Sequence, residues 1–330
     1  MSLAVIEPGP ATTVQDRGRL GYQDRGFSPA GFMDWRAAAL GAALLGNAPG
    51  AACLEFAIAG PTVRFEQAGV FCLTGAQVAA TLDGSPVACC RAVEAPAGSE
   101  LAVGPVRRGQ FGYLSVAGGV GGVPQMGSRS TSVRYALGGI EGRALRAGDL
   151  VPLAAEGIAS LPAMEARAVW AEDSSYGWLS PVTWVRVVPG PDEGALTKEA
   201  LRSFYGSPFT VTARSDRMGY RLSGPSLALS DEGSLASEGV AMGTVQVPAH
   251  GDPIVVMADR QTVGGYRKAA VVATCDLPRL AQCSPGRQVR FEAVSVEKAQ
   301  VLLREDAGYL AGLRARIERA ALALTERRAL

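Results

Sequence analysis

Short apolar runs, bounded by glycine, proline or aspartate, dominate the hydrophobic pattern of this chain. Runs of this kind that are rich in valine, isoleucine and aromatic residues are typical of β-strands. The expected strands cover residues 62–65, 70–73, 112–116, 183–188, 253–257, 270–273 and 288–292. With 41 glycines and 20 prolines available for turns, the sequence predicts a mainly β protein with a few helices.

Helical spacing of apolar residues is confined to three segments. The first begins at Asp34, a candidate N-cap, and ends at Gly46 and Asn47. The other two cover residues 296–304 and 306–328, and in the last one Leu and Ala alternate with Arg and Glu. Because the polar face of this last helix carries both signs of charge, we expect it to pack on protein rather than on a membrane.

The chain is longer than a single hydrophobic core usually grows, and a weak internal repeat divides its 330 residues. Residues 13–22 parallel residues 214–222, and a Pro-Gly-Pro turn precedes each segment. The stretch 155–181 between the halves has no strand pattern and carries acidic residues and serines, as suits an exposed connection. We therefore predict two domains, residues 1–165 and 166–330.

Composition narrows the classes of partner. Lys and Arg number 32 against 31 Asp and Glu, so the net charge of +1 favours neither nucleic acid nor an anionic membrane. The longest nearly apolar stretch, 37–46, is about half of the ~20 residues that a membrane span requires. The N-terminus lacks the basic lead and the long apolar run of a secretory signal. We expect a cytoplasmic protein that binds a small molecule or another protein.

Several common sites are missing from the sequence. There is no Gly-rich P-loop for ATP and no G-x-S-x-G nucleophile turn. The six cysteines lack paired C-x-x-C spacing, so we expect them to be reduced, most of them buried. His250 is the only histidine, and its place before a Gly-x-Pro turn favours a turn role over a catalytic triad. The sequence thus predicts no metal site.

The densest polar pattern lies in residues 237–268, where short strands alternate with glycines and polar side chains. Strands need Val and Ile, and turns need Gly or Pro, but neither need accounts for a carboxylate, amides and a hydroxyl among them. The polar candidates for binding are Glu238, Gln246, Gln261 and Thr262. This density predicts a binding or catalytic surface.

Two further positions are candidates for chemistry. Arg217 follows a predicted strand, and its planar fork suits a carboxylate, bicarbonate or phosphate, with Asp216 orienting it. Asp259 follows the strand 253–257 and, with the amide and hydroxyl after it, could read a planar amide or ureido group. The alternative is that these residues only hold turns. We expect Arg217 and Asp259 to line one cleft.

Four more residues complete the predicted site. Tyr266 could stack on a ligand and Lys268 could supply charge. In the first half, Ser128 and Arg129 lie in a glycine-rich turn whose backbone N–H groups could form an anion nest, with ordinary turn bonding as the alternative.

Ordered motifs along nearly the whole chain resemble one known family, allophanate hydrolase subunit 2 or the KipA-like biotin-dependent carboxyltransferases, which includes the C subunits of 5-oxoprolinases. In family order, these motifs are residues 14–19 (Val-Gln-Asp-Arg-Gly-Arg), 29–34, 46–47, 54–55, 117–119, 127–131, 215–222 and 237–268. The resemblance implies two tandem cyclophilin-like β-barrel domains. The chain departs from the family at Arg267, where proline is common, and this leaves the rigidity of that loop open.

The resemblance implies three functions. The first, which we prefer, is the C subunit of an ATP-dependent 5-oxoprolinase, which acts with a KipI-like B subunit and a metal-dependent A subunit and shares ATP with its partner. The second is carboxyl transfer to urea from biotin on a separate carrier. The third is a non-catalytic regulator of a KipI-like partner. The candidates for a general base are Asp216, Asp259 and Glu238.

Overall fold

The computed structural model of the protein describes residues 1–154, 167–168, 180–230 and 235–329. The chain divides into two compact units that are not consecutive halves of the sequence. Unit 1 contains Met1–Arg19, Ala30–Ser175 and Gly308–Leu330, and unit 2 contains Leu20–Pro29 and Tyr176–Ala307. The domain boundary predicted between residues 165 and 166 lies outside the described residues.

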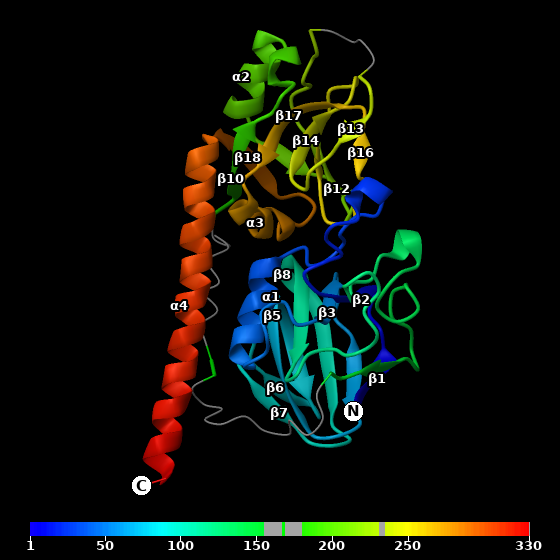
Figure 1. The fold of residues 1–330 in the computed structure, drawn as a ribbon, viewed down its shortest axis with the longest axis vertical. Coiled ribbons are helices and arrows are strands. Elements are labelled where there is room, and N and C mark those ends of the chain that lie inside the picture. Colours follow the sequence, from blue (N-terminus) through cyan, green and yellow to red (C-terminus); the bar gives the residue numbers. More distant parts are fainter. Residues whose placement is uncertain (155–166, 169–179, 231–234, 330) are drawn as a thin grey trace. The chain divides into compact units, whose positions relative to one another are not determined.

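Unit 1 is built on a curved nine-stranded sheet (Figure 1). Its strand order is β2-β3-β8-β4-β1-β9, and β5 pairs with β6, β7 and β8. The strands are β1 Ser2–Glu7, β2 Ala11–Gln15, β3 Cys53–Ala57, β4 Thr62–Phe65, β5 Gly69–Leu82, β6 Ser85–Val87, β7 Val93–Ala95, β8 Glu100–Val116 and β9 Leu150–Pro152. The pairing is antiparallel throughout, so one face of the sheet can turn inward to form a core.

The two longest strands of this sheet, β5 and β8, extend well beyond the predicted runs 70–73 and 112–116. Their register shifts three times between Gly75 and Ala80, and such bulges bend a strand without ending it. Gly75 adopts φ +81°, and a Cβ there would lie 2.5 Å from Phe111 O, so the bend requires glycine. The sequence pattern missed these long strands because the bulges interrupt the alternation of apolar and polar residues.

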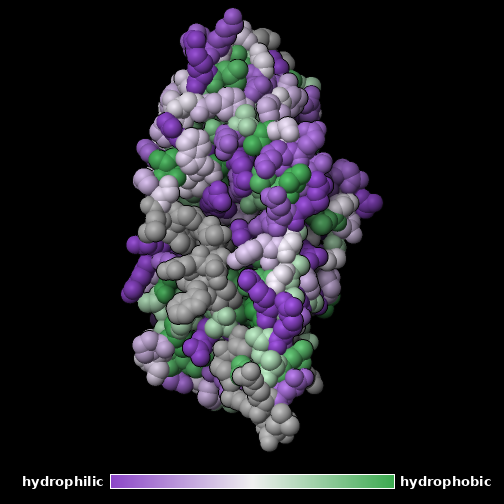
Figure 2. Space-filling view, turned by 90° about the vertical axis from the view of Figure 1, so that its left-hand side faces the viewer, coloured by the Kyte–Doolittle hydropathy of each residue, from purple (hydrophilic) through white to green (hydrophobic). Residues whose placement is uncertain are grey.

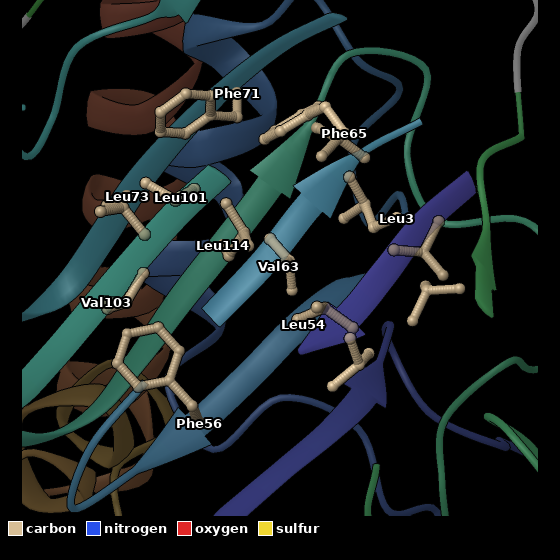
Figure 3. Close-up of a cluster of buried hydrophobic side chains, with 14 of the residues drawn as sticks. Leu3, Leu54, Phe56, Val63, Phe65, Phe71, Leu73, Leu101, Val103 and Leu114 are labelled. Atoms are coloured by element: carbon tan, nitrogen blue, oxygen red, sulfur yellow. The ribbon is translucent and has the colours of Figure 1, made fainter. Parts of the chain in front are cut away.

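The core of unit 1 is a cluster of aliphatic and aromatic side chains from the strands of this sheet. Figure 3 shows side chains from neighbouring strands, among them Leu54, Phe56 and Leu114, meeting in one cluster. A second cluster joins Leu44 of helix α1 (Trp35–Leu44) to Leu313 in the later part of helix α4 (Val296–Ala329). Because α4 is continuous from Val296 to Ala329, the predicted segments 296–304 and 306–328 belong to one helix.

Helix α1 begins as the sequence predicted. Asp34 Oδ1 accepts hydrogen bonds from Arg36 N at 3.1 Å and Ala37 N at 2.9 Å, which confirms Asp34 as the N-cap. The helix ends before Gly46, whose φ of +68° favours glycine.

Unit 2 is a closed seven-stranded barrel with the strand order β10-β17-β14-β15-β12-β11-β18. A two-stranded ribbon, β13 with β16, lies beside it. The elements are β10 Val182–Pro189, α2 Lys198–Gly206, β11 Phe209–Val211, β12 Gly219–Ser223, β13 Glu238–Gly239, β14 Thr244–Val247, β15 Ile254–Val256, β16 Val263–Gly264, β17 Arg267–Val272, α3 Leu277–Ala281 and β18 Gln288–Ala293. The prediction of a mainly β, barrel-based fold is confirmed, with a closed barrel in unit 2 and an open, curved sheet in unit 1.

Aromatic side chains pack helix α2 against the barrel. Phe204 of α2 stacks on Phe291 of β18 with ring centroids 4.8 Å apart, and Phe209 packs against both rings. Helix α2, which was not predicted from the sequence, follows the N-cap Thr197, whose side chain accepts a hydrogen bond from Ala200 N.

Figure 2 shows hydrophilic and hydrophobic residues interspersed over the face that it presents. Among the described helices, none combines the length and the apolar character that crossing a membrane requires.

Candidate functional site

A groove of about 690 Å³ lies in unit 2 beside the β13–β16 ribbon. One wall comes from the ribbon and the residues next to it, and the other from the short helix Gln23–Arg25, which belongs to the dark blue segment drawn beside β16 in Figure 1. The lining residues are Gln23, Asp24, Gly26, Gly239, Val240, Ala241, Thr262 and Val263. Segments far apart in the sequence therefore build one groove.

Hydrogen bonds to both backbone groups of Val240, its N–H and its C=O, hold the ribbon that forms the first wall. Glu238 pairs with Gly264 in the ribbon. Val240 N donates to Thr262 O at 2.9 Å, and Arg260 Nε donates to Val240 O at 3.0 Å. Burial lowers the pKa of the Arg260 guanidinium from its usual range.

Two carboxamides meet the ribbon at Gly264. Gln246 is 1% exposed, and its Nε2 has no hydrogen-bond partner among the described residues. A Cβ on Gly264 would lie 2.8 Å from Gln246 Nε2 and 3.6 Å from Gln261 Nε2. Glycine thus lets both amides approach the backbone next to Val240, a groove residue.

Lys268 and Glu238 form an ion pair beside these amides. Lys268 Nζ donates to Glu238 Oε2 at 3.0 Å, and the lysine is buried whereas the glutamate is exposed. Lys268 lies opposite Gln246 in the β14–β17 pairing. The structure therefore brings together five of the predicted binding residues around the ribbon, namely Glu238, Gln246, Gln261, Thr262 and Lys268.

Arg217 and Asp259 also meet, but they bind each other. Arg217 Nε and Nη2 donate to the two Asp259 oxygens at 2.9 and 3.0 Å. Neither residue is among those that line the groove. Asp216 Oδ1 accepts from Met218 N and Gly219 N, so this carboxylate caps the turn. Tyr266 is exposed and is likewise not a lining residue.

Ser128 and Arg129 belong to unit 1, where their donors surround a carboxylate of the protein itself. Ser128 Oγ donates to Asp16 Oδ1 at 2.6 Å, and Arg129 N donates to Asp16 Oδ2 at 2.6 Å. Ser130 Oγ and Gly18 N add two more bonds to the same carboxylate. The nest therefore exists, and its anion is Asp16.

The remaining candidate nucleophiles lie away from the groove. His250 is exposed in the turn after β14, where Gly251 N donates to Pro248 O at 2.9 Å. All six cysteines are free, and five of them are buried. Burial raises the pKa of the Cys90 thiol to about 12, so it is protonated at neutral pH. Within the described part of the chain, no cluster of His, Cys, Asp or Glu is placed to hold a metal ion.

Three residues at or next to the groove were not predicted from the sequence, namely Gln23, Asp24 and Arg260. A signal for the first two was present, since Gln-Asp-Arg-Gly occurs at residues 15–18 and again at 23–26. Arg260 gave no signal, because a charged residue after a strand is usually exposed and its burial is a tertiary property.

Comparison with known proteins identifies a matching family model and several relatives of this chain. Residues 25–293 match the family model of the carboxyltransferase domain, subdomain A and B. The 5-oxoprolinase C subunit of Escherichia coli (strain K12) is 37% identical over 300 residues, which are 90% of this chain and 93% of that protein. Its counterpart in Haemophilus influenzae is 35% identical over 317 residues, 94% of this chain and 97% of that one.

A solved structure agrees with these matches. The crystal structure of the Kluyveromyces lactis urea carboxylase superposes with a TM-score of 0.84 at 27% identity, and the match covers 94% of this chain but 29% of that one. The family model spans both units, and the two 5-oxoprolinase relatives match over most of their own length. The chain therefore belongs to the carboxyltransferase A and B subdomain family and is a relative of the 5-oxoprolinase C subunits.

Proposed function

We propose that this chain is the C subunit of an ATP-dependent 5-oxoprolinase and helps to activate 5-oxoproline for ring opening to L-glutamate. The observation that carries the proposal is the match in both directions, 90% of this chain with 93% of the Escherichia coli protein. The match to the Kluyveromyces lactis urea carboxylase covers a much smaller share of the relative, 29% of that chain.

The chemistry of the groove supports a lactam as the ligand. One edge of the 5-oxoproline ring presents an N–H donor and a carbonyl acceptor side by side. The Asp24 carboxylate suits the N–H, while the Thr262 hydroxyl and the Gln23 carboxamide suit the carbonyl. Among the candidate bases, Asp216 caps a turn, Asp259 is paired with Arg217 and Glu238 is paired with Lys268. Asp24 is therefore the carboxylate best placed to act on a bound ring.

The lining of the groove does not suit a triphosphate. Among the described lining residues, Asp24 alone is charged, and a triphosphate needs several cationic or backbone donors. We therefore assign ATP to the KipI-like B subunit and ring opening to the metal-dependent A subunit. On this view the isolated chain is weakly active or inactive.

The experiment is ADP release by the chain mixed with its partner B and A subunits, with and without 5-oxoproline. We expect ADP release to depend on all three chains and on the lactam. Thr262→Val, which removes the groove hydroxyl while keeping the shape, is expected to lower this release. Thr210→Val on β11 is the matched control, since Thr210 is not among the groove residues.

Robust turnover of 5-oxoproline by the isolated chain would refute the need for partners. Lactam-dependent ADP release that Thr262→Val leaves unchanged would refute the assignment of the groove. The absence of any lactam-dependent release from the full mixture would refute the oxoprolinase function itself.

A second candidate is carboxyl transfer to urea, which the likeness to the Kluyveromyces lactis urea carboxylase favours. The ureido ring of biotin is neutral and planar, as urea is, so the donors proposed for a lactam also fit it. Biotin would arrive on a separate carrier. Loss of the carboxyl group from carboxybiotin that depends on both urea and this chain would support this function over the first.

A further inference from the structure

Arg260 is a buried cation that the described structure leaves without an anion. The residue is 5% exposed, and its guanidinium makes one hydrogen bond to a described residue, from Nε to Val240 O. Its terminal nitrogens are not among the buried atoms that lack a partner, so they retain some access to solvent. Removing a charge from water is unfavourable unless an opposite charge offsets the loss of hydration.

Other arginines of unit 2 show what is missing at Arg260. Arg186 pairs with Asp276, Arg217 with Asp259, and Arg267 with Asp192. Those three arginine side chains are more exposed than Arg260, and each forms an ion pair with an aspartate carboxylate. The most buried of the four is thus the one that has no carboxylate among the described residues.

The location of Arg260 connects it to the groove. Its Nε bonds to the carbonyl of Val240, and both Val240 and Thr262 line the groove. With Nε occupied, the two terminal nitrogens remain, and together they can bind the two oxygens of one carboxylate. A single fork of this kind suits one carboxylate.

We propose that Arg260, which bonds to the groove residue Val240 without being a lining residue itself, binds the carboxylate of the small-molecule substrate. The inference rests on the proposed function and deepens it, because 5-oxoproline carries a carboxylate next to the lactam nitrogen. In this arrangement the polar lining residues read the amide edge and Arg260 reads the acid. Neutral lactams of the same ring would then bind weakly.

The test uses this chain with matched acidic and neutral ligands. Binding of 5-oxoproline and of 2-pyrrolidinone, the same ring without the carboxylate, is measured by calorimetry for the wild type, Arg260→Lys and Arg260→Gln. A second pair, N-acetylglycine and N-methylacetamide, tests acid recognition without a lactam. We expect the wild type to prefer the acid of each pair by roughly tenfold or more.

Arg260→Gln is expected to abolish that preference while leaving the weak binding of the neutral ligands within roughly twofold, since their amide contacts remain. Arg260→Lys keeps the charge but loses the fork, and is expected to retain only part of the preference. Arg202→Gln, an exposed arginine of unit 2, is the control and should behave as the wild type.

The outcomes separate this inference from the proposed function. Retained acid preference in Arg260→Gln would overturn the inference, as would equal losses for acidic and neutral ligands or no acid preference in the wild type. An acid preference that depends on Arg260 in a chain that gives no lactam-dependent ADP release with its partners would leave the inference standing and remove the oxoprolinase function.

Discussion

Arg217 and Asp259, 42 positions apart in the sequence, are joined by a two-point ion pair of 2.9 and 3.0 Å. The backbone N–H of Asp259 also donates to Arg217 O at 2.8 Å. The turn before β12 and the loop after β15 are therefore fastened together twice. The sequence predicted that Arg217 binds a ligand anion, but in the structure its guanidinium binds the carboxylate of Asp259.

This pair should stabilise the barrel more than a surface pair does, because its side chains are only 18% and 16% exposed. In a double-mutant cycle with Arg217→Met and Asp259→Asn, followed by urea unfolding, we expect a coupling free energy of about 1–2 kcal/mol. The control is Glu199 with Arg202, which are 76% and 74% exposed and should couple by about 0–0.5 kcal/mol. Equal coupling in the two cycles would contradict the prediction.

Gly264 should tolerate no side chain. In Gly264→Ala the new Cβ would lie 2.8 Å from Gln246 Nε2 and 3.2 Å from Val240 Cγ2. Overpacking of this kind should lower the free energy of unfolding by about 1–3 kcal/mol. Gly239→Ala, in the paired strand, meets nothing within 4 Å and should change it by less than about 0.5 kcal/mol. Thermal unfolding of the two variants measures the difference, and similar values would show that Gly264 is not tightly packed.

The Asp16 carboxylate should be essential to unit 1. Asp16→Ala would leave the donors Ser128 Oγ, Ser130 Oγ and Arg129 N without their acceptor. The free energy of unfolding should fall by about 2 kcal/mol or more. Because the vacated nest would still present these donors, added formate should raise the unfolding midpoint of Asp16→Ala but not that of the wild type. Glu94→Ala, at an exposed position of β7, is the control. If formate acts equally on all three proteins, it is not filling the nest.

Asp149 should make the stability of unit 1 depend on pH in the acid range. The two-point hydrogen bond from Arg143, joined by the backbone N–H of Arg146, lowers the pKa of Asp149. A lowered folded-state pKa gives stability that is complete above the unfolded value of about 4 and is lost as the pH falls through the folded value. The wild type should therefore exceed Asp149→Asn in stability at pH 6, and the gap should shrink below pH 4. Urea unfolding across that range measures the gap, and a constant gap would rule out the linkage.

Much of the fold followed from local sequence. Asp34 predicted the start of α1 because an N-cap bond is made within one turn of helix. Strands such as β10 and β18 were expected because their apolar residues recur along the chain itself. The long strands β5 and β8 were not, because bulges break the pattern that a single strand displays.

The tetrapeptide Gln-Asp-Arg-Gly shows where sequence stops being sufficient. At residues 15–18 its aspartate, Asp16, accepts hydrogen bonds from the segment 128–130 of unit 1, whereas at 23–26 its aspartate, Asp24, lines the groove of unit 2. The local sequence is the same, so local preferences cannot separate the two. The sequence by itself determined a β-rich chain with a polar block at 237–268, but partners more than one hundred residues away decided which carboxylate became internal structure and which became part of a binding surface.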